Sequence, residues 1–151
     1  MEPSNPFRVD GLVAVVAGGG TGIGFMIAKA LAGAGAKKVY ILGRRQSALE
    51  TAASVVDVVS KDTGFINLLI ANSGIYGPSK SFTANDSVQD LRKRLLEEVS
   101  MESFTETFHV NVTGAYFTLL AFLELLDAGN TKALEDGYGV PAKPGGKVPT
   151  I

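Results

Sequence analysis

The sequence predicts an α/β fold, an incomplete doubly wound parallel sheet of three strands with flanking helices. Short, continuously apolar runs of the kind that form strands buried on both faces alternate with helix-forming segments. A glycine-rich loop joins the first apolar run to the first helix. The composition agrees, because 151 residues fit one domain, and 46% hydrophobic against 19% charged residues suits a buried sheet.

Charge and residue usage argue against several classes of function. The net charge is -1 and the 14 Lys and Arg residues form no stripe, so we expect no nucleic acid as a partner. No apolar stretch approaches the length of about 20 residues that a membrane span needs, so we expect no membrane partner. With no Cys and one His, no metal site is expected. Residues 1–10 carry no apolar run typical of a signal peptide, and we expect a cytoplasmic protein.

The first half of the chain contains the expected strands. Residues 11–17 form the first apolar run, and residues 25–34 are rich in helix-forming Ala, Leu, Ile and Met. Residues 38–42 are apolar and β-favouring. Residues 46–61 carry apolar residues at the three- and four-residue spacings of a helix, and residues 65–70 read as another buried strand.

The second half is expected to be helical and then irregular. Residues 87–98 predict a short charged helix, and Ser103 with Glu106 predicts the capping box of a long helix that ends near Asp127. Apolar residues lie on nearly every face of its second half, so this helix needs cover from the sheet or from another subunit. Five Gly and three Pro follow within 24 residues. The expected organisation is an N-terminal extension at 1–10, a domain at 11–127 and an irregular Gly/Pro-rich tail at 128–151.

The glycine loop at residues 18–24 is the main candidate binding element. It lies where a buried strand meets a helix, so its bare backbone can approach a pyrophosphate while the helix N-terminus supplies N–H groups and positive dipole. A tight turn without a ligand is the alternative. The candidate cofactor-binding residues are Gly18, Gly20, Thr21, Gly22, Ile23 and Gly24.

Three motifs in order resemble those of the short-chain dehydrogenase/reductase family. The Gly-x-x-x-Gly-x-Gly spacing at 18–24 resembles the family's glycine motif, and residues 72–74 resemble its Asn-Ala-Gly after the fourth strand. Residues 109–114 are similar to its helix segment around the asparagine, here Asn111. The resemblance implies a Rossmann-like fold and hydride transfer between a nicotinamide and a carbonyl or alcohol. It adds Asn72, Ser73 and Gly74 to the expected cofactor-binding residues and Asn111 to the expected catalytic residues.

The same resemblance exposes two gaps. Family members have a further strand between their second and fourth strands, whereas only the helix at 46–61 lies there in this chain, so the expected strand order is 2-1-4 in family numbering. The family's catalytic Ser and Tyr-x-x-x-Lys are also missing. Tyr76 and Lys80 match the spacing, but the Gly and Pro between them make a helix improbable, so we expect a loop. Without a Lys to serve, Asn111 is expected to be a helix residue with a solvent or backbone partner.

The end of the second strand predicts the cofactor. An acidic residue there would bind the ribose 2′-hydroxyl of NAD(H), but Arg44 and Arg45 offer forked donors suited to a 2′-phosphate. We therefore expect NADP(H), and less readily NAD(H). A pair of solvated arginines in a loop is the alternative.

The leading hypothesis is a truncated oxidoreductase of this family, inactive alone. The alternative is a non-catalytic nucleotide-binding or interaction module that pairs with a full-length relative. The resemblance implies association through the 101–127 helix, as a homo-oligomer or with such a relative. The candidate contacts are Tyr116, Leu119, Leu120 and Leu123.

Overall fold

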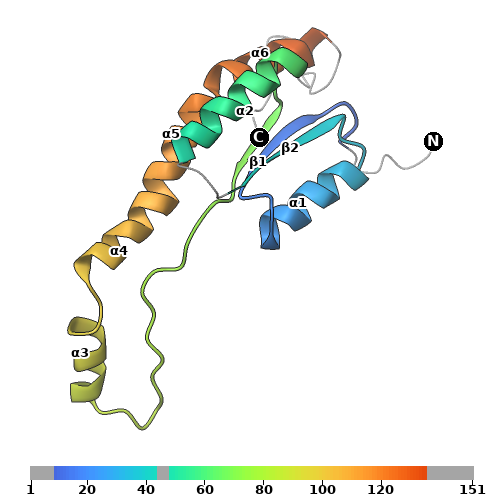
Figure 1. Cartoon of the computed structure of the whole chain (residues 1–151). Helices are drawn as coiled ribbons and strands as arrows, with labels where there is room; N and C mark the ends of the chain where they lie inside the picture. The colour runs from blue at the N-terminus through green and yellow to red at the C-terminus, as the bar shows by residue number, and fades with distance from the viewer. Residues whose placement is uncertain (1–8, 44–47, 136–151) are drawn as a thin grey trace.

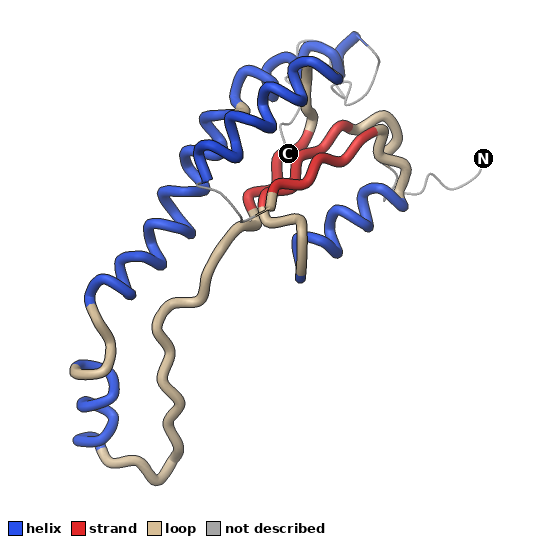
Figure 2. Tube along the Cα trace, viewed as in Figure 1, coloured by secondary structure: helices blue, strands red, loops and turns tan. Residues whose placement is uncertain are grey.

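The computed structural model describes residues 9–43 and 48–135, and these form the expected three-stranded sheet with helices on both faces (Figures 1 and 2). The strands are β1 (Val13–Ala17), β2 (Lys38–Leu42) and β3 (Leu68–Ala71). They run parallel in the order β2-β1-β3. The predicted fold class and strand order are therefore confirmed.

Two helices explain this order, because each crosses the sheet in a different direction. Helix α1 (Gly22–Gly33) returns the chain from β1 to β2, and α2 (Ala48–Asp62) carries it from β2 back past β1 to β3. They lie on opposite faces of the sheet (Figure 1). At 1.5 Å per residue, the 15 residues of α2 span about 22 Å. In the part of the chain that the structure describes, no further strand lies between β2 and β3.

The hydrophobic core lies between the sheet and the helices that cover it on the same side as α2. All five residues of β1 are buried, as the continuous apolar run predicts for a central strand. Val59 of α2, Ile66 and Phe122 are fully buried against them. Ile66 precedes β3 although it was expected within that strand, and its backbone N–H donates to the carbonyl of Leu125 over 3.0 Å.

The long helix expected at 101–127 is divided in the structure. It comprises α4 (Met101–Phe108), the π-helical segment η1 (His109–Thr113), α5 (Gly114–Ala121) and α6 (Leu123–Glu135). No single described helix is long and apolar enough to cross a membrane; the segments 101–121 and 123–132 meet the length and composition test only as a pair bent by 52°. Fully buried Phe122 marks that bend.

Two expectations about this region were wrong. The N-cap is Ser100, whose side chain accepts a hydrogen bond from the backbone of Ser103, so the helix starts before the expected capping box. The irregular tail was expected from residue 128, but α6 continues to Glu135. Gly129 is a packing residue in this helix, because an added Cβ would overlap the carbonyl oxygen of Ile66 and lie 2.7 Å from its carbon.

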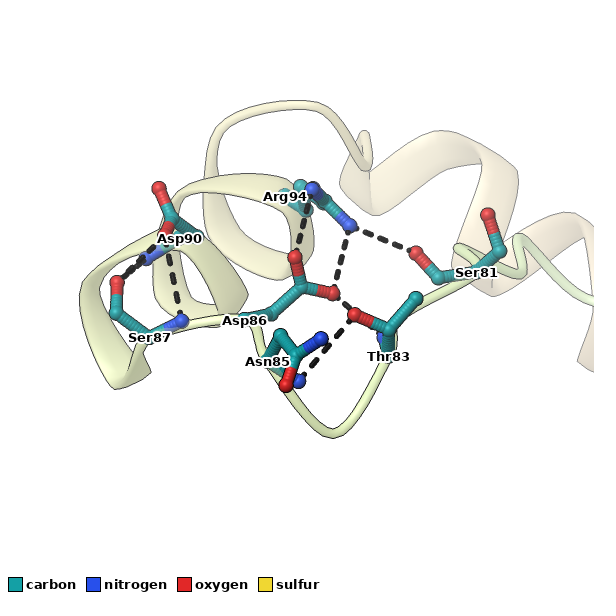
Figure 3. A network of polar contacts seen from close by, with 7 residues as sticks. All are labelled: Ser81, Thr83, Asn85, Asp86, Ser87, Asp90 and Arg94. Carbon is teal, nitrogen blue, oxygen red and sulfur yellow. Dashed lines mark hydrogen bonds and ion pairs between the residues drawn. The ribbon is translucent and has the colours of Figure 1, made fainter.

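Residues 75–100 project away from the sheet as an arm of extended chain and one helix, α3 (Val88–Leu96) (Figures 1 and 2). None of the α3 residues is buried, so polar contacts hold the arm. Arg94 contacts both carboxylate oxygens of Asp86 at 3.2 and 3.1 Å, and donates to the carbonyl of Ser81 at 2.9 Å (Figure 3). Ser87 and Asp90 form a capping box at the start of α3.

Candidate functional site

A cavity of about 540 Å³ opens where β1 and β3 end. Its walls come from two segments, the glycine loop after β1 and the loop after β3. In α/β proteins, ligands bind at the carboxyl ends of two neighbouring parallel strands whose following connections run to opposite faces of the sheet. The residues that line it are Gly18, Thr21, Gly22, Ile23, Asn72, Ser73, Gly74, Ile75 and Tyr76.

The glycines bring these two loops together. Gly18 has φ 76°, a conformation that favours glycine, and an added Cβ would lie 2.9 Å from the backbone nitrogen of Ser73. Gly24 is buried beneath the loop, where a Cβ would overlap the carbonyl oxygen of Gly18 and lie 2.7 Å from Nδ2 of Asn72. A side chain at either position would separate the two walls of the cavity.

The open side of the glycine loop has room for a ligand. An added Cβ on Gly20 or Gly22 would meet no atom within 4 Å. Thr21 is the N-cap of α1, yet its side chain makes no capping hydrogen bond, and the first turn contains no acidic residue. The first residues of α1 line the cavity, and their N–H groups have no capping side chain and lie at the positive end of the helix dipole. This geometry fits the pyrophosphate of a dinucleotide.

The loop after β3 is held by η1. Asn111 accepts a hydrogen bond from the backbone nitrogen of Ile75 and donates one to its carbonyl oxygen, each over 2.9 Å. An added Cβ on Gly74 would lie 3.1 Å from Oδ1 of Asn111, so the glycine permits this approach. The carboxamide of Asn111 therefore positions the cavity wall through a backbone partner.

Tyr76 and Lys80 do not form a helical pair. The chain from residue 72 to 83 is irregular, and Nζ of Lys80 lies 3.1 Å from a carboxylate oxygen of Glu98. The expectation of a loop is therefore confirmed. Tyr76 nevertheless lines the cavity, as does Ile75, although neither was predicted to be a cofactor-binding residue. Their position directly after the Asn-Ser-Gly segment is the signal that could have identified them.

The remaining candidates are placed differently. Gly20 and Gly24 do not line the cavity: Gly20 is exposed on the loop, and Gly24 supports it from below. Arg44 and Arg45 lie outside the described residues. Within residues 9–43 and 48–135, no three His, Cys, Asp or Glu side chains are grouped so that they could hold a metal ion.

Sequence comparisons identify relatives of this chain. Residues 13–72 match the model of the KR domain family. The chain is 49% identical over 141 residues to the short-chain dehydrogenase/reductase SAT3 of Stachybotrys chartarum, in an alignment that covers 80% of this chain and 52% of the relative. It is 45% identical over 150 residues to the short-chain dehydrogenase/reductase PhomF of Diaporthe leptostromiformis, covering 83% and 50%. The chain thus spans about half the length of these curated relatives.

Solved structures share the fold. The L-sorbose reductase of Gluconobacter frateurii, complexed with NADPH and L-sorbose, superposes with a TM-score of 0.61 at 19% identity, over 82% of this chain and 51% of that one. The ligand-free aldohexose dehydrogenase of Thermoplasma acidophilum gives 0.59 at 20% identity, over 78% and 45%. At such low identity these two structures support the fold alone. The KR domain match, the sequence relatives and the three ordered motifs together assign this chain to the short-chain dehydrogenase/reductase family.

Proposed function

We propose that this chain is the nucleotide-binding part of an NADP(H)-dependent oxidoreductase that transfers hydride between the nicotinamide and a carbonyl or alcohol. The observation that carries the proposal is the cavity between the glycine loop and the loop after β3. Both walls are positioned by contacts that a side chain at Gly18 or Gly24 would break. The open N-terminus of α1 supplies donors for a pyrophosphate.

The preference for NADP(H) rests on the sequence. Arg44 and Arg45 follow β2, and an acidic residue that would repel a 2′-phosphate is absent from that position. Replacing both arginines by Ala should weaken NADPH binding and leave NADH binding nearly unchanged. Equal affinities of the variant and the original chain for NADPH would refute the role of these arginines.

Hydride transfer also requires proton-transfer residues, so we propose this activity for an oxidoreductase that contains both this nucleotide-binding part and those residues. In these 151 residues Tyr76 and Lys80 are the only Tyr-x-x-x-Lys match, and Lys80 contacts Glu98. We therefore expect this chain alone to bind nucleotide without reducing a carbonyl. Carbonyl-dependent oxidation of NADPH by the purified chain, measured at 340 nm, would contradict this expectation.

A titration with NADPH and NADH followed by thermal unfolding tests the proposal directly. A ligand that binds only the folded chain stabilises it by about 2.7 kcal/mol at 100 times its Kd. We expect saturable stabilisation that favours NADPH. Gly24→Ala is the matched negative control, since its added Cβ would overlap the glycine loop. A melting temperature that does not respond to either nucleotide would overturn the proposal.

We also propose that the chain associates through residues 101–127, which form α4, η1, α5 and the start of α6. Tyr116, Leu119, Leu120 and Leu123 are 44 to 57% exposed in the single chain, which is unusual for a row of large apolar side chains. Burying them against an identical surface would remove this area from water. Sedimentation velocity should give a dimer for the original chain and a monomer for Leu120→Glu. The proposal fails if both proteins sediment alike.

A further inference from the structure

Tyr76 is the most exposed large apolar or aromatic side chain among the described residues. Its relative exposure is 100%, against 64% for Phe82 on the same loop. Yet Tyr76 lines the cavity, whereas Phe82 does not. No described residue makes a hydrogen bond or a ring contact with it. A tyrosine ring has a large apolar surface that gains from cover, so a ring left open at the rim of a cavity is available to a ligand.

The backbone on both sides of Tyr76 is held. Ile75 exchanges two hydrogen bonds of 2.9 Å with Asn111. Gly77 packs on α4, where an added Cβ would lie 3.2 Å from Oγ1 of Thr107. Because its two neighbours are anchored to η1 and α4, the ring is presented at a defined place on the cavity rim.

The strand order decides which half of a dinucleotide would reach this ring. In the proposed site the glycine loop that follows β1 would hold the pyrophosphate, and β2 and β3 lie on opposite sides of β1. The 2′-phosphate site proposed after β2 places the adenosine half on that side. The other half of the molecule, which carries the nicotinamide, must then extend toward β3 and Tyr76.

We propose that the ring of Tyr76 packs against the nicotinamide half of the bound nucleotide and selects intact dinucleotides over adenosine fragments. This inference rests on the proposed nucleotide site and adds a contact residue to it. An aromatic contact of this kind accounts for about a 2- to 10-fold difference in affinity. The ring supplies this contact, so Tyr76→Phe retains the affinity.

Calorimetric titration of the full chain with NADPH and with adenosine 2′,5′-bisphosphate tests the contact. Tyr76→Ala should weaken NADPH binding about 2- to 10-fold and leave the affinity for the bisphosphate unchanged. Phe82→Ala is the matched control and should change neither affinity. If Tyr76→Ala leaves NADPH affinity unchanged, or weakens both ligands equally, the inference is wrong. If the original chain binds neither ligand, the proposed nucleotide site fails, and this inference fails with it.

A fluorescence measurement checks the position of the ring independently. The chain contains no Trp, so Tyr76→Trp and Phe82→Trp each introduce a single Trp on the same loop, and its emission can be excited apart from that of the remaining tyrosines. NADP⁺ absorbs little at the emission wavelength, so strong quenching requires contact with the nicotinamide. We expect saturable quenching for Tyr76→Trp and little for Phe82→Trp. Equal quenching of the two variants would overturn the inference.

Discussion

The oxygen and the nitrogen of the Asn111 carboxamide both hydrogen-bond to the backbone of Ile75. Oδ1 accepts from the Ile75 nitrogen and Nδ2 donates to the Ile75 oxygen, each over 2.9 Å. The two residues are 36 positions apart, one in a π-helical turn and the other in the cavity wall. π-Helical turns within α-helices are frequent at functional sites. Here the turn carries the residue that fixes the wall.

Asn111→Ala should release this wall. Two net hydrogen bonds at an exposed site correspond to a loss of about 1 to 2 kcal/mol in the free energy of unfolding. The sharper readout is hydrogen exchange, because the Ile75 amide loses its acceptor and should exchange faster. Asn85→Ala, in an exposed turn of the same arm, is the control and should leave the Ile75 amide protected. Unchanged exchange at Ile75 in Asn111→Ala would contradict the prediction.

Two glycines of α1 should respond oppositely to alanine. At Gly24 the added Cβ would overlap the Gly18 carbonyl oxygen, so we expect a destabilisation of about 1 to 3 kcal/mol and loss of nucleotide binding. At Gly33 a Cβ meets nothing within 4 Å, and helix propensity should raise stability by up to about 1 kcal/mol. Urea unfolding of both variants measures the difference. A Gly24→Ala chain as stable as the original would show that the loop is not packed in this way.

Gly129→Ala should damage the core through α6. The added Cβ would overlap the Ile66 carbonyl oxygen, so α6 or the chain before β3 must shift. This shift strains the hydrogen bond of 3.3 Å from Asn67 to the Gly129 carbonyl. We expect a loss of about 3 kcal/mol in urea unfolding, with Gly33→Ala as the helical control. An unchanged unfolding midpoint would show that α6 does not pack here.

Asp62 should make stability depend on acid pH. Hydrogen bonds from Lys38 and then from Tyr40, whose hydroxyl lies 2.6 Å away, hold the pKa of the Asp62 carboxyl below its ordinary value of 3.8. A folded-state pKa that is lowered contributes stability above the unfolded value, and this contribution is lost as pH falls through the folded value. Asp62→Asn should therefore be less stable than the original chain at neutral pH, and the two should converge below about pH 4.

Urea unfolding from about pH 3 to pH 8 measures this convergence. Asp57→Asn on the exposed face of the same helix is the control and should parallel the original chain throughout. A difference between Asp62→Asn and the original chain that stays constant down to about pH 3 would contradict the prediction. The same contact raises the pKa of Lys38, chiefly through its hydrogen bond to Asp62. The contribution of Lys38 to the free energy of unfolding is thus present below pH 10.5 and is lost only above it.

Local patterns in the sequence determined the sheet and the glycine loop. The apolar run before the loop became β1, buried at every position, and residues 38–42 became β2 with the expected bounds. The single helix between β2 and the next strand gave the order β2-β1-β3. These features follow from residues near one another in the chain, because strand burial and loop conformation are set by short-range composition.

Tertiary structure alone decided the features that depend on distant residues. A glycine such as Gly129 usually weakens a helix, yet Gly129 lies within α6. It is required there because any side chain would overlap the carbonyl oxygen of Ile66. Asn111, in the π-helical turn, hydrogen-bonds to the backbone of Ile75, and Gly77 packs against Thr107. These contacts hold the residues on both sides of Tyr76, which lines the cavity. Such contacts join residues 30 or more positions apart, as with the 36 between Ile75 and Asn111. No local pattern encodes them, since their free energy is gained only when the separated segments meet.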